Sequence, residues 1–178
     1  MTLEEAIISK ISHDLAGGIG ALMNTVDLMK MDDTFAAEGM DLLHSSSMML
    51  NARLKFFRAL YGAENKTINT ALVTDYLKTL APSFELKGDV STRLQLAMIL
   101  VGIEILSLGG KIEVGAKSVK LSGEELRQNS SFIQALVESD VPVSTENVAA
   151  VWLVHLAKEK GKHVHLDTKN SDLVLTIA

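Results

Sequence analysis

The first 62 residues contain no proline and repeat apolar residues at helical spacing, which constrains the fold more than any other feature of the sequence. Two such stretches flank Met31–Thr34, a polar segment with candidate helix caps. Steps of three and four place apolar side chains along one narrow stripe of a helix. The first stripe contains Ile8, Ile11, Leu15, Ile19, Leu22, Val26 and Met29; the second contains Met40, Leu43, Leu50, Leu54, Phe57 and Tyr61, with Gly62 as the expected stop.

Two helices of about 28 residues, each ~42 Å long, joined by a short turn, predict an antiparallel hairpin. A single hairpin leaves one flank of its apolar stripes uncovered. A second copy would cover that flank and complete a four-helix bundle. We therefore expect residues 1–62 to form a dimerisation domain, and the protein to be a homodimer.

Residues 63–178 predict a second domain of different architecture. Gly62–Lys66 is the expected linker, and helices alternate with strand hairpins, which favours an α+β sandwich in which helices back a sheet. Helices are expected over residues 69–81, 91–107 with Ser91 as cap, 130–139, and from Ser144 or Thr145 to about Lys160; strands are expected over 111–114, 118–121, 163–167 and 173–177, with a turn near Asn170–Asp172.

Composition and charge exclude several classes of function. The formal charge of −5 disfavours nucleic acid or an anionic membrane as the main partner, and the lack of cysteine excludes disulfides and thiolate metal sites. The longest apolar run, Leu96–Ile103, has eight residues, whereas a membrane span needs roughly 20. The N-terminus lacks the pattern of a secretory signal. We expect a cytoplasmic protein that binds no metal or cofactor of its own.

His13 lies on the first predicted helix, about 165° from the mean direction of the apolar stripe if each residue turns the helix by ~100°. It should therefore face water, on an outer stripe with Lys10, Gly17, Gly20 and Asn24, which we expect to line a groove where a partner protein docks. A neutral imidazole can attack phosphorus and later leave. Asp14 can hold the other ring nitrogen in its protonated form. Adjacent helical residues point about 100° apart, however, so Asp14 can instead act on the phosphoryl donor or on Mg²⁺. Placement alone also fits an ordinary surface histidine.

The glycines and the other histidines leave alternatives open. Gly17, Gly18 and Gly20 each cost about 1 kcal/mol relative to alanine inside a helix, so they either let a partner's helix approach or mark a kink or an end. His44 could line the same docking groove or be a second phospho-acceptor. His163 and His165 share one face of a predicted strand and are interpreted as plain strand residues.

The segment Ile11–Ala21 resembles the phospho-acceptor helix of the ChpT-type histidine phosphotransferases, whose pattern is close to H-D-L-x-S-P-x-G-A. Gly17 and Gly18 stand where that family has Ser-Pro. The matching residues are His13, Asp14, Leu15, Gly20 and Ala21. The resemblance spans nearly the whole chain and implies a dimerising hairpin followed by a degenerate Bergerat-type ATPase domain.

This resemblance implies a phosphorelay through phospho-His13. A hybrid sensor kinase and response regulators would supply receiver domains, each bringing an aspartate and Mg²⁺. Residues 91–128 contain no asparagine, and no Asp-x-Gly-x-Gly motif occurs, so the second domain lacks the groups that hold Mg²⁺-ATP in a working kinase. Two other functions remain open: a non-catalytic dimer that binds and blocks receivers, and an active ATP-dependent kinase.

Overall fold

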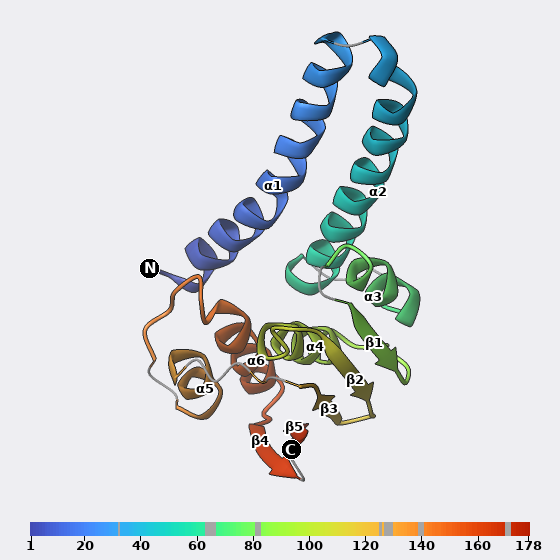
Figure 1. Ribbon diagram of the computed structural model, residues 1–178. Helices are drawn as coiled ribbons and strands as arrows, with labels where there is room; N and C mark the ends of the chain where they lie inside the picture. Colours follow the sequence, from blue (N-terminus) through green and yellow to red (C-terminus); the bar gives the residue numbers. More distant parts are fainter. Residues whose placement is uncertain are drawn as a thin grey trace.

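The computed structural model describes residues 1–31, 33–62, 67–80, 83–124, 126, 130–138, 141–169 and 172–178. A long helical hairpin projects from a unit in which helices cover a β-sheet (Figure 1). We call this second part the C-terminal unit; it comprises the described residues from 67 onward. The fold is α+β, as predicted.

The hairpin consists of α1 (Leu3–Met31) and α2 (Ala36–Tyr61), joined through a short 3₁₀ helix, η1 (Asp33–Phe35). Both helices are confirmed, and α1 runs through its glycines without a break. The helices approach closely at Gly18, where an added Cβ would lie only 2.5 Å from Cδ2 of Leu50. Gly62 ends α2 as expected, donating its backbone N–H to the carbonyl of Arg58.

The sheet of the C-terminal unit has five strands in the order β1-β2-β3-β5-β4. Only β1 and β2 pair in parallel; the other neighbours are antiparallel. The hairpins β2–β3 and β4–β5 are the two predicted from the sequence. The strands are β1 (Phe84–Lys87), β2 (Gly110–Val114), β3 (Ser118–Ser122), β4 (Val164–Lys169) and β5 (Asp172–Ile177).

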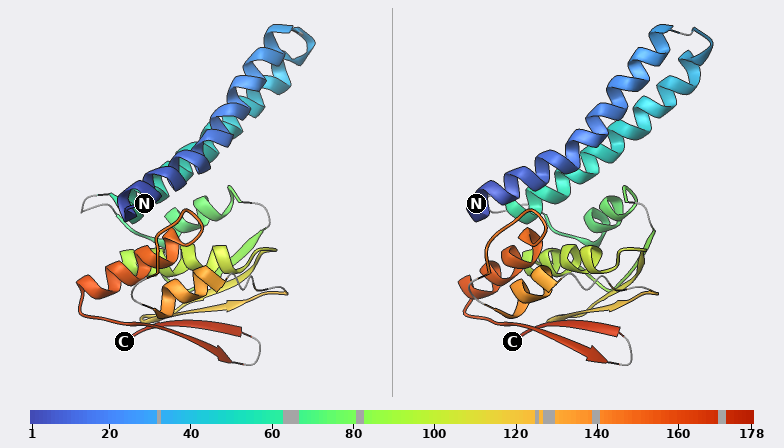
Figure 2. Two further views of the ribbon diagram at one scale, coloured as in Figure 1. Left: turned by 90° about the vertical axis from the view of Figure 1, so that its left-hand side faces the viewer. Right: turned by 60° about the vertical axis from the view of Figure 1, so that its left-hand side comes forward.

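In the described part of the C-terminal unit there are four helices, and they lie between the sheet and the hairpin (Figure 2). The central one is α4, most of whose side chains are buried. The last turns of α2 enter the same core, where the ring of Phe56 stacks on that of Tyr76 at a centroid distance of 3.9 Å. The hairpin is thus anchored at one end. The helices are α3 (Thr70–Leu77), α4 (Arg93–Ile105), α5 (Ser130–Val137) and α6 (Val148–Glu159).

Two local predictions about the C-terminal unit were wrong, and one strand was not predicted at all. The cap of α4 is Thr92 and not Ser91, because the Thr92 hydroxyl accepts the N–H of Gln95, which completes a capping box. The last helix begins at Val148, since the side chain of Asn147 instead builds a turn with the N–H of Ser144. Strand β1 was missed, because four alternating residues are a weak signal.

Two further expectations cannot be compared with the structure. Most of the expected linker, residues 63–66, and the tip of the expected turn, residues 170–171, lie outside the described residues. Within the described part of the chain, no helix has both the length and the apolar character needed to cross a lipid bilayer.

Candidate functional site

His13 lies in the first half of α1 with its side chain 88% exposed, as its position opposite the apolar stripe predicted. Its ring Nδ1 lies 3.2 Å from Oδ1 of Asp14. A carboxylate can only accept, so this contact is a hydrogen bond when Nδ1 carries the proton. In that form Nε2 carries no proton, and its lone pair is free on an exposed side chain.

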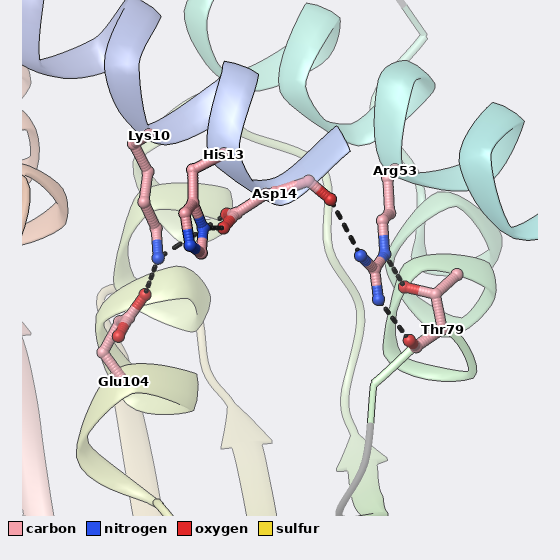
Figure 3. Close-up of polar contacts among 6 residues, drawn as sticks. All are labelled: Lys10, His13, Asp14, Arg53, Thr79 and Glu104. Carbon is pink, nitrogen blue, oxygen red and sulfur yellow. Dashed lines mark hydrogen bonds and ion pairs between the residues drawn. The ribbon is translucent and has the colours of Figure 1, made fainter. Parts of the chain in front are cut away.

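Asp14 itself is largely covered, with 21% of its side chain exposed. Its second oxygen, Oδ2, lies 3.5 Å from Nζ of Lys10, one helical turn earlier. The ammonium group of Lys10 also lies 3.0 Å from Oε1 of Glu104 on α4. Figure 3 shows these contacts, with Glu104 rising from α4 toward the ammonium group of Lys10 and the ring of His13 lying between Lys10 and the carboxylate of Asp14.

The charge of Lys10 is stabilised by this arrangement. Burial alone would lower the pKa of Lys10, but the carboxylates of Glu104 and Asp14 together outweigh it and raise that pKa above its usual value. Lys10 is therefore a fixed cation at neutral pH. The sequence predicts Lys10 as a docking residue on the outer stripe, whereas in the structure its ammonium group pairs with Asp14 and Glu104 of the same chain.

The main chain of Asp14 is held from the other side by Arg53 on α2. Nη1 of Arg53 donates to the carbonyl oxygen of Asp14 at 2.9 Å. Nε and Nη2 donate to the hydroxyl and carbonyl oxygens of Thr79, just beyond α3, at 3.1 and 2.7 Å. One guanidinium group thus connects α1, α2 and the end of α3 (Figure 3).

A groove of about 240 Å³ between α1 and α2 begins one turn after His13. Gly17 forms part of its wall, and an added Cβ there would meet no atom within 4 Å, so the space is open. The lining residues are Gly17, Gly18, Ala21, Ser46, Met49, Leu50 and Arg53. The groove therefore opens on the same hairpin that carries His13.

The other predicted site residues lie farther along the hairpin. Gly20 is half-buried with open space beside it, and Asn24 is exposed one turn later on α1. His44 is exposed on α2 but does not line the groove. His163 and His165 are exposed at the start of β4. The described residues contain no cluster of three or more His, Cys, Asp or Glu side chains that could hold a metal ion.

Residues 66–172 match the family described as histidine phosphotransferase C-terminal domain. The chain belongs to this family. The protein phosphotransferase ChpT of Brucella abortus (strain 2308) is 24% identical over 199 residues, covering 99% of this chain and 95% of its own. A solved structure, of a bacterial phosphotransferase, is also 24% identical and has the same fold, with a TM-score of 0.80 over 99% of this chain and 95% of that chain.

The sequence of this histidine phosphotransferase predicts His13 and Asp14 as site residues, but it does not predict the groups that hold them. Glu104, Arg53 and Thr79 come from helices that are distant in sequence, and no local pattern links them to His13. The one available signal was Glu104 itself, a charged residue directly after the apolar run Leu96–Ile103. A charge in that position is placed either at a surface or at a polar contact such as the one with Lys10.

Proposed function

We propose that this histidine phosphotransferase carries a phosphoryl group on His13 between receiver domains of a hybrid sensor kinase and of response regulators. Membership of the family supports phosphotransfer in a phosphorelay. The observation that points to His13 is an almost fully exposed imidazole whose Nδ1 is within hydrogen-bond distance of a covered carboxylate.

The chemistry follows from this geometry. Nε2 attacks the phosphorus of an aspartyl phosphate, a P–N bond forms, and the P–O bond to the aspartate breaks with its electron pair leaving on the carboxylate. No proton has to leave Nε2, because the proton is on Nδ1. The ring becomes positively charged as the bond forms, and Asp14 stabilises that charge. In the second transfer another aspartate attacks, and the electron pair of the P–N bond returns to Nε2.

We further propose that the receiver brings the second half of the site. In the transition state of transfer, the phosphoryl group carries negative charge on three oxygens, and Mg²⁺ neutralises this charge. In this proposal Mg²⁺ and the acceptor aspartate come from the receiver, while this chain contributes His13 and the groove beside it. Gly17, Gly20 and Asn24 would face the docked receiver. The lack of cysteine supports a reducing cytoplasm as the place of action.

The proposed homodimer would form through the hairpin. Only part of the predicted apolar stripes is used within one hairpin, because several of their members are exposed. Burying these side chains against a second copy would give a four-helix bundle and remove apolar surface from water. The exposed members are Ile8, Ile19 and Val26 on α1, and Met40 and Leu54 on α2.

We also propose that the C-terminal unit does not bind ATP. The sequence of α4 contains no asparagine to hold Mg²⁺, and the segment after it contains no Asp-x-Gly-x-Gly motif. Calorimetry with Mg²⁺-ATP tests this directly. A dissociation constant below about 100 µM, equivalent to about −5.5 kcal/mol, would refute this proposal and would leave an ATP-dependent kinase open.

The test of the main proposal is phosphoryl transfer from a phosphorylated receiver to the wild-type protein, His13→Ala and His44→Ala. We expect an acid-labile label on the wild type and on His44→Ala, and none on His13→Ala. Equal labelling of His13→Ala would refute the assignment. Receiver binding that survives His13→Ala, with no label on any of the three proteins, would favour the non-catalytic, inhibitory dimer.

A further inference from the structure

We propose that Glu104 of the C-terminal unit is a positioning residue for phosphotransfer, acting through Lys10 and Asp14 on the imidazole of His13. This inference rests on the function proposed for His13. It gives the C-terminal unit a specific part in the reaction. Helix α4 would control how strongly the carboxylate of Asp14 accepts the hydrogen bond from the imidazole of His13.

The contacts form a continuous relay from α4 to the reactive ring. Oε1 of Glu104 lies 3.0 Å from Nζ of Lys10. The same ammonium group lies 3.5 Å from Oδ2 of Asp14, and the other oxygen of Asp14 lies 3.2 Å from Nδ1 of His13. Asp14 is thus shared between a cation and an imidazole, and Lys10 is shared between two carboxylates. Glu104 holds the ammonium group closer than Asp14 does.

Burial separates this relay from ordinary surface ion pairs. Asp14, Lys10 and Glu104 have 21%, 22% and 26% of their side chains exposed, whereas His13 is 88% exposed. Partly desolvated charges interact more strongly than charges in water. Glu104 is also fixed in place, since it belongs to the helix with the most buried residues in the C-terminal unit. The relay therefore has a partly buried inner end on α4 and an exposed outer end at His13.

The other groups that face the relay do not replace its parts. Arg53 on α2 holds the main-chain carbonyl of Asp14 and not its carboxylate. Tyr61 and Tyr76 are neutral at physiological pH, because burial, together with the negative charges of Asp14 and Glu104, raises the pKa of both hydroxyl groups. Lys10 is therefore the cation in contact with the carboxylate of Asp14.

The relay predicts the sign of the change in the His13 tautomer when one of its charges is lost. If Glu104 loses its charge, Lys10 is drawn wholly to Asp14, which then accepts less strongly from Nδ1 of His13. The imidazole should shift from the Nδ1–H form, whose Nε2 is the nucleophile, toward the Nε2–H form, which has no free lone pair in the outward direction. If Lys10 loses its charge, Asp14 is released to His13 and the shift should have the opposite sign.

The decisive experiment compares full-length Glu104→Gln and Lys10→Met with the wild type. The first readout is the tautomer of His13, from long-range ¹H–¹⁵N NMR correlations at a pH where the ring is neutral. The second is the rate of phosphoryl transfer from a phosphorylated receiver. Glu85→Gln is the matched control, because Glu85 pairs with Lys87 on the exposed surface of β1 and the substitution changes the net charge equally.

We expect Glu104→Gln to raise the Nε2–H population and to slow transfer about tenfold, the lower end of the loss seen when a metal-binding histidine loses its orienting partner. Lys10→Met should lower the Nε2–H population, and Glu85→Gln should change neither readout. A purely structural role for the ion pair would not move the tautomer in opposite directions.

Two results would overturn the relay. One is a Glu104→Gln tautomer and rate equal to those of the wild type and Glu85→Gln. The other is the same sign of tautomer shift in Glu104→Gln and Lys10→Met. The tautomer is read without any receiver, so a failure of the relay is distinguishable from a failure of the proposed function, which shows as label on His13→Ala.

Discussion

At the scale of single residues, His13 and Asp14 could be predicted, whereas their supports could not. Helical rotation alone places His13 in solvent, and the structure confirms this. Rotation left the role of Asp14 open, and its carboxylate does reach the ring. Arg53 touches Asp14 across 39 positions of sequence. Such contacts depend on how helices pack, which periodicity within one helix does not encode.

Arg53→Ala should destabilise the protein by about 1.5–3 kcal/mol, because charge-assisted hydrogen bonds are lost and partly buried acceptors on Asp14 and Thr79 lose their donors. Urea unfolding measures this difference. The matched control is Arg58→Ala, an exposed arginine on the same helix, which should change the unfolding free energy by less than about 0.5 kcal/mol. Equal effects of the two substitutions would contradict the anchoring role of Arg53.

At the scale of secondary-structure elements, the sequence predicted long elements well and short ones poorly. The helical spacing of the apolar residues Ile19, Leu22 and Val26 correctly indicated that α1 continues past its glycines. Strand β1 has only four residues and is defined by its parallel partner β2, so its own sequence carries little signal. Helix caps were misplaced by one to three residues, since Ser, Thr and Asn all cap helices and neighbouring candidates compete.

Gly17→Ala should stabilise the folded protein by about 1 kcal/mol, because alanine favours the helix and its methyl group meets open space. It should nevertheless slow transfer from a receiver, since the methyl group narrows the groove beside His13. Urea unfolding and transfer rates measure the two effects. Gly18→Ala is the comparison: it forces Leu50 to move, so little or no stabilisation is expected. Unchanged transfer by Gly17→Ala would argue against docking along this groove.

Thr92→Ala should cost about 1 kcal/mol, within the 0.5–2 kcal/mol range of lost N-caps, because the capping box of α4 is broken. Ser91→Ala should cost clearly less, although Ser91 is the cap that the sequence suggested. Both differences are measurable by chemical unfolding. A larger loss for Ser91→Ala would mean that α4 is capped differently from the structure.

At the scale of the whole molecule, the α+β class and the order of hairpin before sheet followed from the sequence. The mode of attachment did not: the hairpin joins the core through aromatic packing around Phe56 and Tyr76, and through the Lys10–Glu104 ion pair. Part of the apolar stripes of the hairpin stays exposed in one copy of the chain. The homodimer that the sequence predicts from these stripes stays a prediction.

Ile19→Lys should convert the dimer to a monomer, because Ile19 is 50% exposed on the proposed interface and burying an unpaired lysine opposes association. Sedimentation or light scattering measures the mass. Leu108→Lys is the control, since Leu108 is 60% exposed on the C-terminal unit and away from the hairpin; that variant should stay dimeric. A wild-type protein that is monomeric at micromolar concentration would exclude the proposed bundle.

The most direct measurement locates the phosphoryl group itself. After transfer from a phosphorylated receiver, with the protein kept at alkaline pH, fragment mass spectrometry identifies the modified residue and ¹H–³¹P NMR identifies the ring nitrogen. The account predicts one phosphoryl group per chain, on Nε2 of His13. A phosphoryl group on His44 or any other side chain, or none on a protein that binds the phosphorylated receiver, would contradict it.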